Sequence, residues 1–116
     1  IAGPLVVVAQ AGNVNTGGFD PMPAIADAVS EHANAWIHVD GAFGLWAAVS
    51  PRLRPLVAGV DRADSWATDA HKWLNAPYDC GLVAVADPGA LRAALSMDAA
   101  YVTGATLHVN GGMFMD

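Results

Sequence analysis

The chain has few or none of several sequence features, namely cysteines, long apolar runs and basic clusters, and their scarcity limits the classes of protein to which it can belong. It has one cysteine, Cys80, and so no partner for a disulfide within its 116 residues. No apolar run approaches the length of about 18 residues that crosses a membrane, and no signal-peptide pattern is present. The net charge of -6 and the lack of a basic cluster give no support to nucleic-acid binding. A reducing, cytoplasmic setting is therefore expected.

Charged residues are also scarce. They make up 14% of the chain, whereas 54% of the residues are hydrophobic and the mean hydropathy is +0.36. A domain that stands alone in water usually has more charge. The length suits one domain at most, and the first residue is Ile1 rather than methionine. We therefore expect the chain to be an interior part of a larger protein.

Lysine occurs once, as Lys72 in the run Thr68-Asp69-Ala70-His71-Lys72-Trp73. Other positive charge comes from four arginines. Unlike arginine, a lysine amine can lose its proton and attack a carbonyl carbon to form a Schiff base. Lys72 is therefore a candidate for covalent chemistry. The alternative is a surface lysine beside a turn.

Apolar runs separated by turn residues predict strands that alternate with helices. Aspartate-proline pairs, with Asp20 and Asp87, are expected to cap two of the helices. Continuous apolar strands are typical of a parallel sheet that is covered on both faces. The predicted fold class is therefore α/β, a partial parallel sheet with flanking helices. The strands are expected at 5–9, 36–39, 65–68 and 82–86, the helices at 21–34 and about 89–97, and a partly helical segment at 51–60.

Two of the predicted strands end in residues that can do chemistry. The run Trp36–Asp40 ends in an acid and leads into the turn Gly41–Gly44, and the run 65–69 leads into Lys72. Parallel strands joined by a right-handed crossover have their carboxyl ends on one edge of the sheet. Ligands bind at that edge in α/β proteins. Asp40 and Lys72 are therefore expected to face one cleft.

These residues resemble a known family. His38-Val39-Asp40-Gly41-Ala42 and Asp69-Ala70-His71-Lys72-Trp73 are similar to motifs of the pyridoxal-phosphate-dependent group II amino-acid decarboxylases. The loop Ala11–Pro21 and the run Pro77–Gly81 fit the same family, so the resemblance covers about residues 1–100. It implies part of the large domain of an aspartate-aminotransferase-like, fold type I enzyme. It also implies pyridoxal 5'-phosphate as cofactor, an amino acid as substrate and a homodimeric parent enzyme.

The resemblance implies a role for each matching residue. Lys72 would hold the cofactor as a Schiff base. Asp40 would pair with the ring nitrogen and keep it protonated, so that the ring acts as an electron sink. Ala42 would pack against one face of the ring, and Asn13 would lie near the ring substituents. His71, which joins Lys72 and Asp40 in the implied catalytic set, would lie near the phosphate or the substrate.

Two positions depart from the family pattern. Asp69 is also placed near the phosphate or the substrate, but it stands where some members have asparagine. A carboxylate beside a phosphate is unfavourable unless it is protonated or offset by a cation. Gly41 stands where many members have alanine, which is expected to loosen the turn and spare the chemistry.

Simpler interpretations stay open. Asp40 could cap the turn after its strand. His38 shares a strand face with Asp40, but two ligands are too few for a metal site, and a packed core histidine accounts for it. The chain could also be a non-catalytic α/β segment, or belong to another pyridoxal-phosphate lyase of the same fold. Parts of the family's active site precede Ile1, so the isolated chain is expected to be inactive.

The last residues resemble a different family. The run Tyr101–Met115 is similar to the C-terminal strand and turn of the short-chain dehydrogenases/reductases. It contains neither the catalytic tyrosine-lysine pair nor the glycine-rich nucleotide loop of that family. We therefore expect a partial pyridoxal-phosphate-binding large domain at 1–100 and a reductase-like tail at 101–116.

Overall fold

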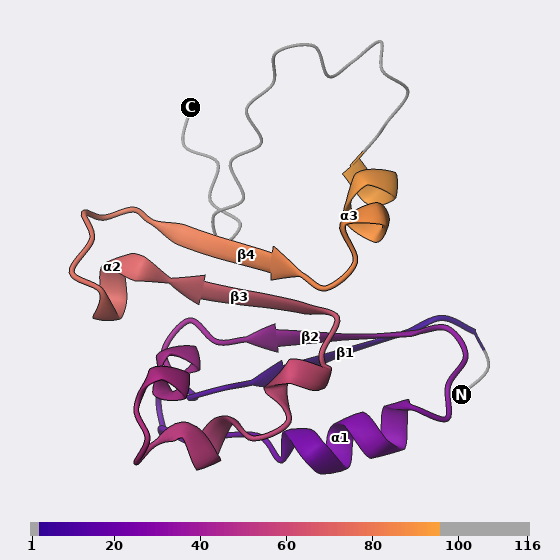
Figure 1. The fold of residues 1–116 in the computed structure, drawn as a ribbon, viewed down its shortest axis with the longest axis horizontal. Coiled ribbons are helices and arrows are strands. Elements are labelled where there is room, and N and C mark those ends of the chain that lie inside the picture. Colours follow the sequence, from indigo (N-terminus) through magenta and orange to yellow (C-terminus); the bar gives the residue numbers. More distant parts are fainter. Residues whose placement is uncertain (1–2, 96–116) are drawn as a thin grey trace, which may run out of the picture.

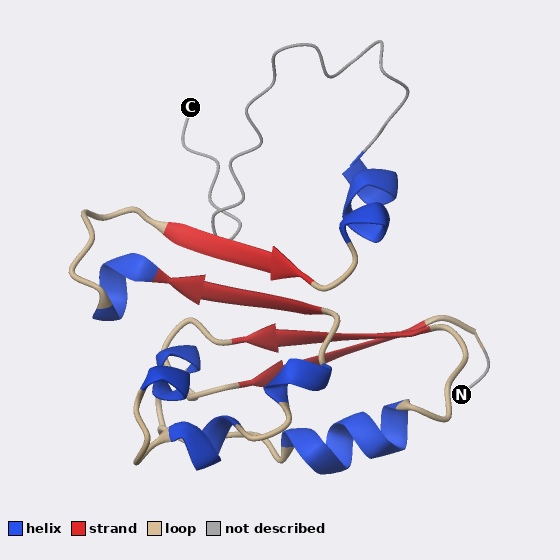
Figure 2. Cartoon of the chain, viewed as in Figure 1, coloured by secondary structure: helices blue, strands red, loops and turns tan. Residues whose placement is uncertain are grey.

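A four-stranded sheet organises residues 3–95, the part of the chain that the computed structural model describes (Figure 1). In sheet order its strands are β1 (Leu5–Gln10), β2 (Ala35–Asp40), β3 (Ser65–Asp69) and β4 (Gly81–Val85). The helices are α1 (Met22–Val29), α2 (Ala70–Trp73) and α3 (Pro88–Leu95), with short 3-10 helices η1 (Leu45–Val49), η2 (Arg54–Val57) and η3 (Val60–Arg62) (Figure 2). The α/β class and the four strands are confirmed.

Strand direction divides the sheet into two parts. β1, β2 and β3 run parallel, whereas β4 runs antiparallel to β3, as the arrows in Figure 1 show. The prediction of a parallel sheet is therefore wrong for β4. A parallel neighbour needs a crossover of a dozen or more residues, usually a helix, and the segment 70–80 contains only the one-turn α2. The sheet is mixed, and β4 begins at the edge where β3 ends.

The hydrophobic core lies on one face of the sheet. Ile37 and Val39 alternate along β2 and are 4% and 0% exposed. On the opposite face of β1, Val6 and Val8 are 67% and 62% exposed. Within residues 3–95, helices therefore cover one face of β1 and not both, contrary to the expectation. The buried cluster comprises Ala9, Ala11, Met22, Ala26, Ile37, Val39, Val57 and Ala63.

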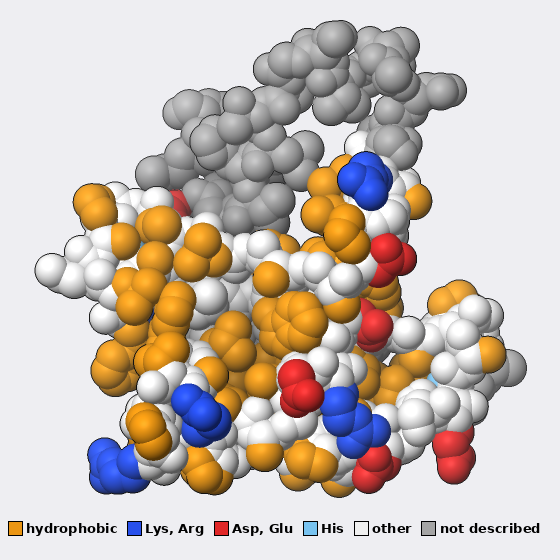
Figure 3. Space-filling model, viewed as in Figure 1, with side chains coloured by type: hydrophobic (Ala, Val, Ile, Leu, Met, Phe, Trp, Pro, Cys, Tyr) orange, Lys and Arg blue, Asp and Glu red, His pale blue; other side chains and the backbone are white. Residues whose placement is uncertain are grey.

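Large apolar side chains remain exposed well beyond β1. Figure 3 shows apolar side chains over much of the visible face, while charged ones lie near α1 and the 3-10 helices and near α3. Trp73, the last residue of α2, and Tyr78, in the segment that follows α2, are 66% and 78% exposed. Extended exposed apolar surface usually marks a region that contacts other protein. No helix within residues 3–95 is long and apolar enough to span a membrane.

The two aspartate-proline pairs behave differently. Asp87 caps α3 as predicted, since the backbone N–H of Gly89 donates to its Oδ1 at 2.7 Å. Asp20 does not cap α1, which begins at Met22 without a side-chain cap. Its carboxylate instead accepts the backbone N–H of Gln10 at 2.7 Å. Asp20 therefore ties the end of β1 to the segment that leads into α1.

Candidate functional site

Three loops meet where the parallel strands end. Gln10 lies opposite Asp40, and Asp40 lies opposite Ala67. The Gly41 N–H donates to the Ala67 carbonyl at 2.8 Å, and the Thr68 hydroxyl donates to the Gly41 carbonyl at 3.0 Å. The turn after β2 is thereby fixed to the end of β3. This region, called the carboxyl edge below, comprises residues 11–19, 40–44 and 69–73.

Lys72 lies at the carboxyl edge, in α2. Its Nζ is 2.6 Å from Oδ2 of Asp69 and 4.0 Å from the centre of the Phe43 ring. The two ion-pair side chains are 29% and 24% exposed, so water shields the pair only in part. A carboxylate and the face of an aromatic ring both favour an ammonium group. Lys72 is thus an exposed residue whose ammonium group contacts both the end of β3 and the turn after β2.

His71 lies beside this ion pair. Its Nδ1 is 3.1 Å from both the backbone N–H and the carbonyl of Cys80. A backbone N–H can only donate, so we assign Nδ1 as the acceptor of the Cys80 N–H, while the Cys80 carbonyl accepts the N–H of Ala70 at 2.9 Å. The proton of the neutral ring is then on Nε2, which faces Asp69 at 4.0 Å. The ring also contacts Tyr78 edge-on, with 4.6 Å between centroids.

Asp40 ends β2 and closes the turn that follows. Its Oδ1 accepts the backbone N–H of Ala42 at 3.2 Å, a contact that aspartate makes in many turns. Asp40 therefore does cap the turn after its strand, as one interpretation of the sequence proposed. No hydrogen bond within residues 3–95 uses the other oxygen, Oδ2. The turn role leaves that oxygen for a second partner.

Asn13 organises the loop that follows β1. Its Nδ2 donates to Oε1 of Gln10 at 2.7 Å. Its Oδ1 accepts the backbone N–H groups of Asn15 at 3.0 Å and Thr16 at 3.1 Å. Both ends of the Asn13 amide are thus used inside the loop. The residue shapes the carboxyl edge before any ligand is considered.

Two close backbone approaches also shape this edge. A Cβ on Gly12 would lie 2.8 Å from the Gly44 backbone, and one on Gly44 would overlap the Ala11 carbonyl oxygen. A Cβ on the buried Gly41 would lie 2.5 Å from the Cβ of Leu45. The expectation that glycine loosens this turn is wrong, because Leu45 fills the space that an alanine methyl would need. Glycine at 41 fits a tight turn.

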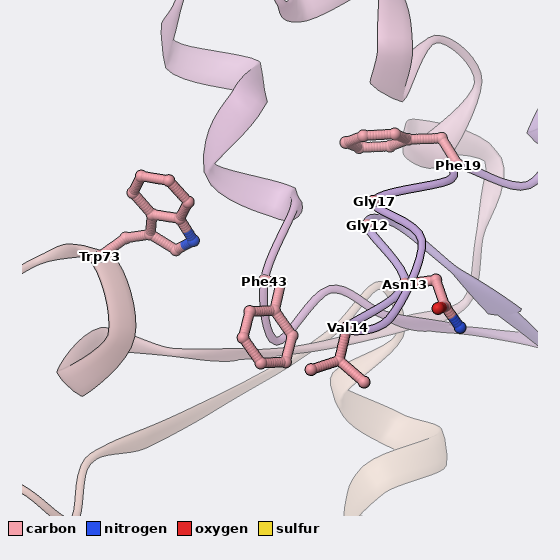
Figure 4. Close-up of a pocket in the computed structure, with 7 residues that line it drawn as sticks. All are labelled: Gly12, Asn13, Val14, Gly17, Phe19, Phe43 and Trp73. Atoms are coloured by element: carbon pink, nitrogen blue, oxygen red, sulfur yellow. The ribbon is translucent and has the colours of Figure 1, made fainter.

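A pocket of about 310 Å³ opens beside the ion pair (Figure 4). Figure 4 shows three aromatic rings around it, with Trp73 and Phe19 on different sides of Phe43. Among residues 3–95, no charged side chain lines the pocket. Asp40 and Lys72 were expected to face one cleft, but neither of them lines this pocket, which is formed by their neighbours. Its lining comprises Gly12, Asn13, Val14, Gly17, Phe19, Phe43 and Trp73.

The structure brings the predicted residues together to different degrees. Asp69 and Lys72 are in direct contact, His71 adjoins them, and the other predicted residues lie on neighbouring loops. Sequence reasoning missed Phe43, and it missed Trp46, whose Nε1 donates to the Asp69 carbonyl at 3.2 Å. The spacing of Asp69 and Lys72, three residues apart at a helix start, was a signal for their pairing.

His38 belongs to a separate hydrogen-bonded group. Its Nδ1 lies 2.8 Å from the hydroxyl oxygen of Ser65, which also accepts the indole N–H of Trp36 at 2.8 Å. His38 is thus hydrogen-bonded, but it is partly exposed and alternates along β2 with the buried Ile37 and Val39, so the expectation of a core histidine is wrong. Within residues 3–95, no group of three or more histidine, cysteine, aspartate or glutamate side chains could hold a metal ion.

Comparison with protein families gives the same assignment as the motifs. The profile described as "Pyridoxal-dependent decarboxylase conserved domain" matches residues 2–113. The chain belongs to this family. The match extends into residues 101–113, part of the expected reductase-like tail, which lies outside the described residues.

Individual relatives show how much of the family the chain spans. It is 39% identical over 99 residues to tyrosine decarboxylase from Oryza sativa subsp. japonica, covering 85% of this chain and 19% of that protein. The structure of Catharanthus roseus tryptophan decarboxylase with L-tryptophan matches with a TM-score of 0.73 and 33% identity, over 82% of this chain and 20% of that one.

A third relative has a different named substrate. The glutamate decarboxylase domain of the diaminobutyrate-pyruvate transaminase and L-2,4-diaminobutyrate decarboxylase from Vibrio parahaemolyticus matches with a TM-score of 0.72 and 34% identity, over 79% of this chain and 20% of that one. The chain therefore spans about a fifth of these relatives. Its fold is part of the fold type I architecture.

Proposed function

We propose that the chain is the part of a pyridoxal-phosphate-dependent amino-acid decarboxylase that binds the cofactor ring and attaches it covalently. The observation behind this proposal is the position of the sole lysine. Lys72 lies at the carboxyl edge against Asp69 and Phe43, next to the strand that ends in Asp40. Family membership supports the same function.

The groups at the carboxyl edge fit one end of the cofactor. Lys72 provides a primary amine for an aldehyde, and Oδ2 of Asp40 is available to accept a ring N–H. When bound, pyridoxal phosphate supplies an electron-poor ring that stabilises the charge left on the α-carbon as carbon dioxide departs. The phosphate end is matched less well, since Lys72 and His71 are the only basic side chains in residues 11–19, 40–44 and 69–73. Further phosphate ligands must come from elsewhere in the protein.

Each residue of the proposed site then has a defined task. Lys72 attaches the cofactor, and Asp40 keeps the ring nitrogen protonated through a charge-assisted hydrogen bond. Ala42 packs against one face of the ring, and Asn13 holds its loop near the ring substituents. His71 and Asp69 lie near the phosphate or the substrate. Before the cofactor is attached, Lys72 is the cation that offsets the Asp69 charge.

Chemical trapping tests the attachment. The protein is expressed with the sequence that flanks residues 1–116 in its gene, saturated with pyridoxal 5'-phosphate and reduced with borohydride. Peptide mapping is expected to find the cofactor on Lys72. A label on another residue would contradict the assignment, and the absence of any label would favour a non-catalytic segment.

The pocket supports an aromatic amino acid as the substrate. Its rings from Phe19, Phe43 and Trp73 offer stacking partners. In the described part of the chain, no charged side chain lines the pocket to pair with an ionised substrate side chain. We expect tyrosine, tryptophan or phenylalanine to be decarboxylated more efficiently than 2,4-diaminobutyrate. Trp73→Ala is expected to lower kcat/KM for the aromatic substrate about tenfold. Equal rates with both classes would contradict this assignment.

We make three further proposals about the parent enzyme and the isolated chain. The enzyme is a cytoplasmic homodimer, and the exposed Trp73, Leu74 and Tyr78 are available for contact with further protein. Light scattering of the purified protein and cell fractionation test these statements. Residues 1–116 alone are inactive, because the phosphate lacks ligands and apolar surface is exposed. Carbon dioxide release by the purified 116-residue chain, abolished by Lys72→Ala, would contradict this.

We also propose that residues 101–116 form a reductase-like tail joined to the decarboxylase part near residue 100. The pattern of Tyr101–Met115 supports this division. Sequencing of the gene beyond the codon for residue 116 tests it. A downstream reading frame that continues as a decarboxylase would contradict it.

A further inference from the structure

The ion pair at the carboxyl edge involves Nζ of Lys72, the same nitrogen that must react with the cofactor aldehyde in the proposed function. Nζ of Lys72 is 2.6 Å from Oδ2 of Asp69, and its positive charge faces the Phe43 ring at 4.0 Å. Both contacts stabilise an ammonium group. An amine can attack a carbonyl carbon only with a free lone pair, which an ammonium lacks. The arrangement therefore opposes the reaction that Lys72 is proposed to perform.

We propose that Asp69 is a positioning residue that restrains Lys72 until an aldehyde arrives. This inference rests on the proposed function. Covalent capture requires the Lys72–Asp69 pair to open, after which a carbon–nitrogen double bond replaces the aldehyde carbonyl. The carbonyl oxygen leaves as water with two of the three ammonium protons, and the third proton stays on nitrogen. No oxidant or further reactant is needed.

The other contacts of Asp69 leave its carboxylate free for this task. Its side chain makes no capping hydrogen bond to α2, although it precedes that helix. Nε2 of His71 lies 4.0 Å away, beyond hydrogen-bond range. Only the backbone carbonyl of Asp69 contacts Trp46. Asp69→Asn therefore keeps the shape and the backbone contact, and it removes the charge that holds Lys72.

Reactivity of the lysine amine gives a test that does not depend on enzyme activity. Trace labelling with acetic anhydride, followed by mass spectrometry, measures how readily Nζ reacts. Lys72 is the only lysine in these 116 residues, so its peptide is identified without ambiguity. Asp69→Asn is expected to raise the labelling rate about fivefold, as loss of a partly exposed ion pair allows. Borohydride-trapped capture of pyridoxal 5'-phosphate is expected to accelerate to a similar extent.

Matched variants separate restraint from a structural effect. Asp69→Glu keeps a carboxylate within reach and is expected to retain slow labelling. Asp27→Asn removes a comparable pair, in which Asp27 lies 2.7 Å from Arg62, and is expected to leave Lys72 unaffected. Should Asp69→Asn fail to fold, salt provides a second measurement on the unsubstituted protein. Higher ionic strength weakens partly exposed pairs, so labelling of Lys72 is expected to speed up.

The outcomes distinguish this inference from the proposed function. Unchanged or slower labelling in folded Asp69→Asn overturns the inference, as does labelling that is insensitive to salt when that variant does not fold. If borohydride fixes the cofactor on Lys72 while Asp69→Asn captures it no faster, only the inference fails. If borohydride fixes no cofactor on Lys72 of the unsubstituted protein, the proposed function fails.

Discussion

The carboxyl edge and the covered face of the sheet are built from the same strands but from opposite kinds of side chain. At the edge, Asp69 and Lys72 are charged, about a quarter exposed and in contact with each other. On the covered face, Ile37 and Val39 are apolar and almost fully buried. Val39 is followed directly by Asp40, so the change from one region to the other takes a single residue.

The two regions are expected to contribute differently: the charged pair to chemistry, and the buried apolar residues to stability. A partly exposed charged pair contributes little to the free energy of unfolding, whereas each buried methyl group contributes measurably. Substitutions of the charged side chains at the carboxyl edge should therefore change function and leave folding nearly intact. Substitutions on the covered face should do the reverse.

The largest effect is expected for the attachment residue. Lys72→Ala should abolish borohydride-trapped cofactor, because no other lysine is present in residues 1–116. Lys72→Arg is the matched control, since it keeps a cation beside Asp69 and also cannot form the carbon–nitrogen double bond. Both variants should unfold at nearly the same urea concentration as the unsubstituted protein. A large loss of stability in Lys72→Arg would break the separation between edge and core.

The next effect concerns the acid at the end of β2. Asp40→Asn keeps an oxygen for the Ala42 N–H but loses the negative charge, whereas Asp40→Ala loses both. If the acid stabilises the protonated ring nitrogen, both variants should retain some cofactor and lose turnover by about a hundredfold or more. If Asp40 acts only in the turn, Asn should restore near-normal decarboxylation. Steady-state assays of both variants decide between the two.

The covered face should show the opposite behaviour. Val39→Ala removes two buried methyl groups and is expected to lower the free energy of unfolding by about 2 kcal/mol. Val8→Ala, on the exposed face of β1, should change it by less than about 0.5 kcal/mol. Urea denaturation of both variants measures the difference. Equal losses would show that further protein covers the exposed face in the assembled molecule.

The smallest effect is expected at Asp87, which lies in neither region and therefore serves as a reference. Asp87→Ala removes the side-chain cap of α3 and is expected to cost about 1 kcal/mol. Asp87→Asn, which keeps a capping oxygen, should cost only a few tenths of that. Thermal unfolding followed by circular dichroism checks both values, and cofactor capture should not change in either variant.

The sequence predicted the positions of the strands better than their direction or surroundings. Apolar runs located all four strands, and the expected right-handed crossover between parallel strands placed Asp40 and Lys72 at one edge. A period of two or a continuous apolar run is the same for either strand direction, so the antiparallel β4 was missed. Capping was ambiguous for a similar reason. Asp20 and Asp87 both precede a proline, but the carboxylate of Asp20 accepts a hydrogen bond from the backbone N–H of Gln10, ten residues away in sequence.

The candidate site was predictable as a set of residues but not as a set of contacts. The spacing placed Lys72 one helical turn after Asp69. It could not predict the contact of Lys72 with the Phe43 ring, which lies in the turn after β2. The tightness at Gly41 was also hidden, because it depends on where the side chain of Leu45 lies. Contacts between loops follow from the assembled sheet and not from local pattern.

The contact between Gly12 and Gly44 has a consequence for mutational scanning. Neither residue has a reactive group, yet each faces backbone that a side chain would strike. In a selection for enzyme activity, both positions would therefore be as intolerant as Lys72. Measuring cellular abundance alongside activity would tell them apart, because glycine substitutions would deplete the protein and Lys72 substitutions would leave it abundant and inert. Intolerance alone is thus a poor guide to chemistry at this edge.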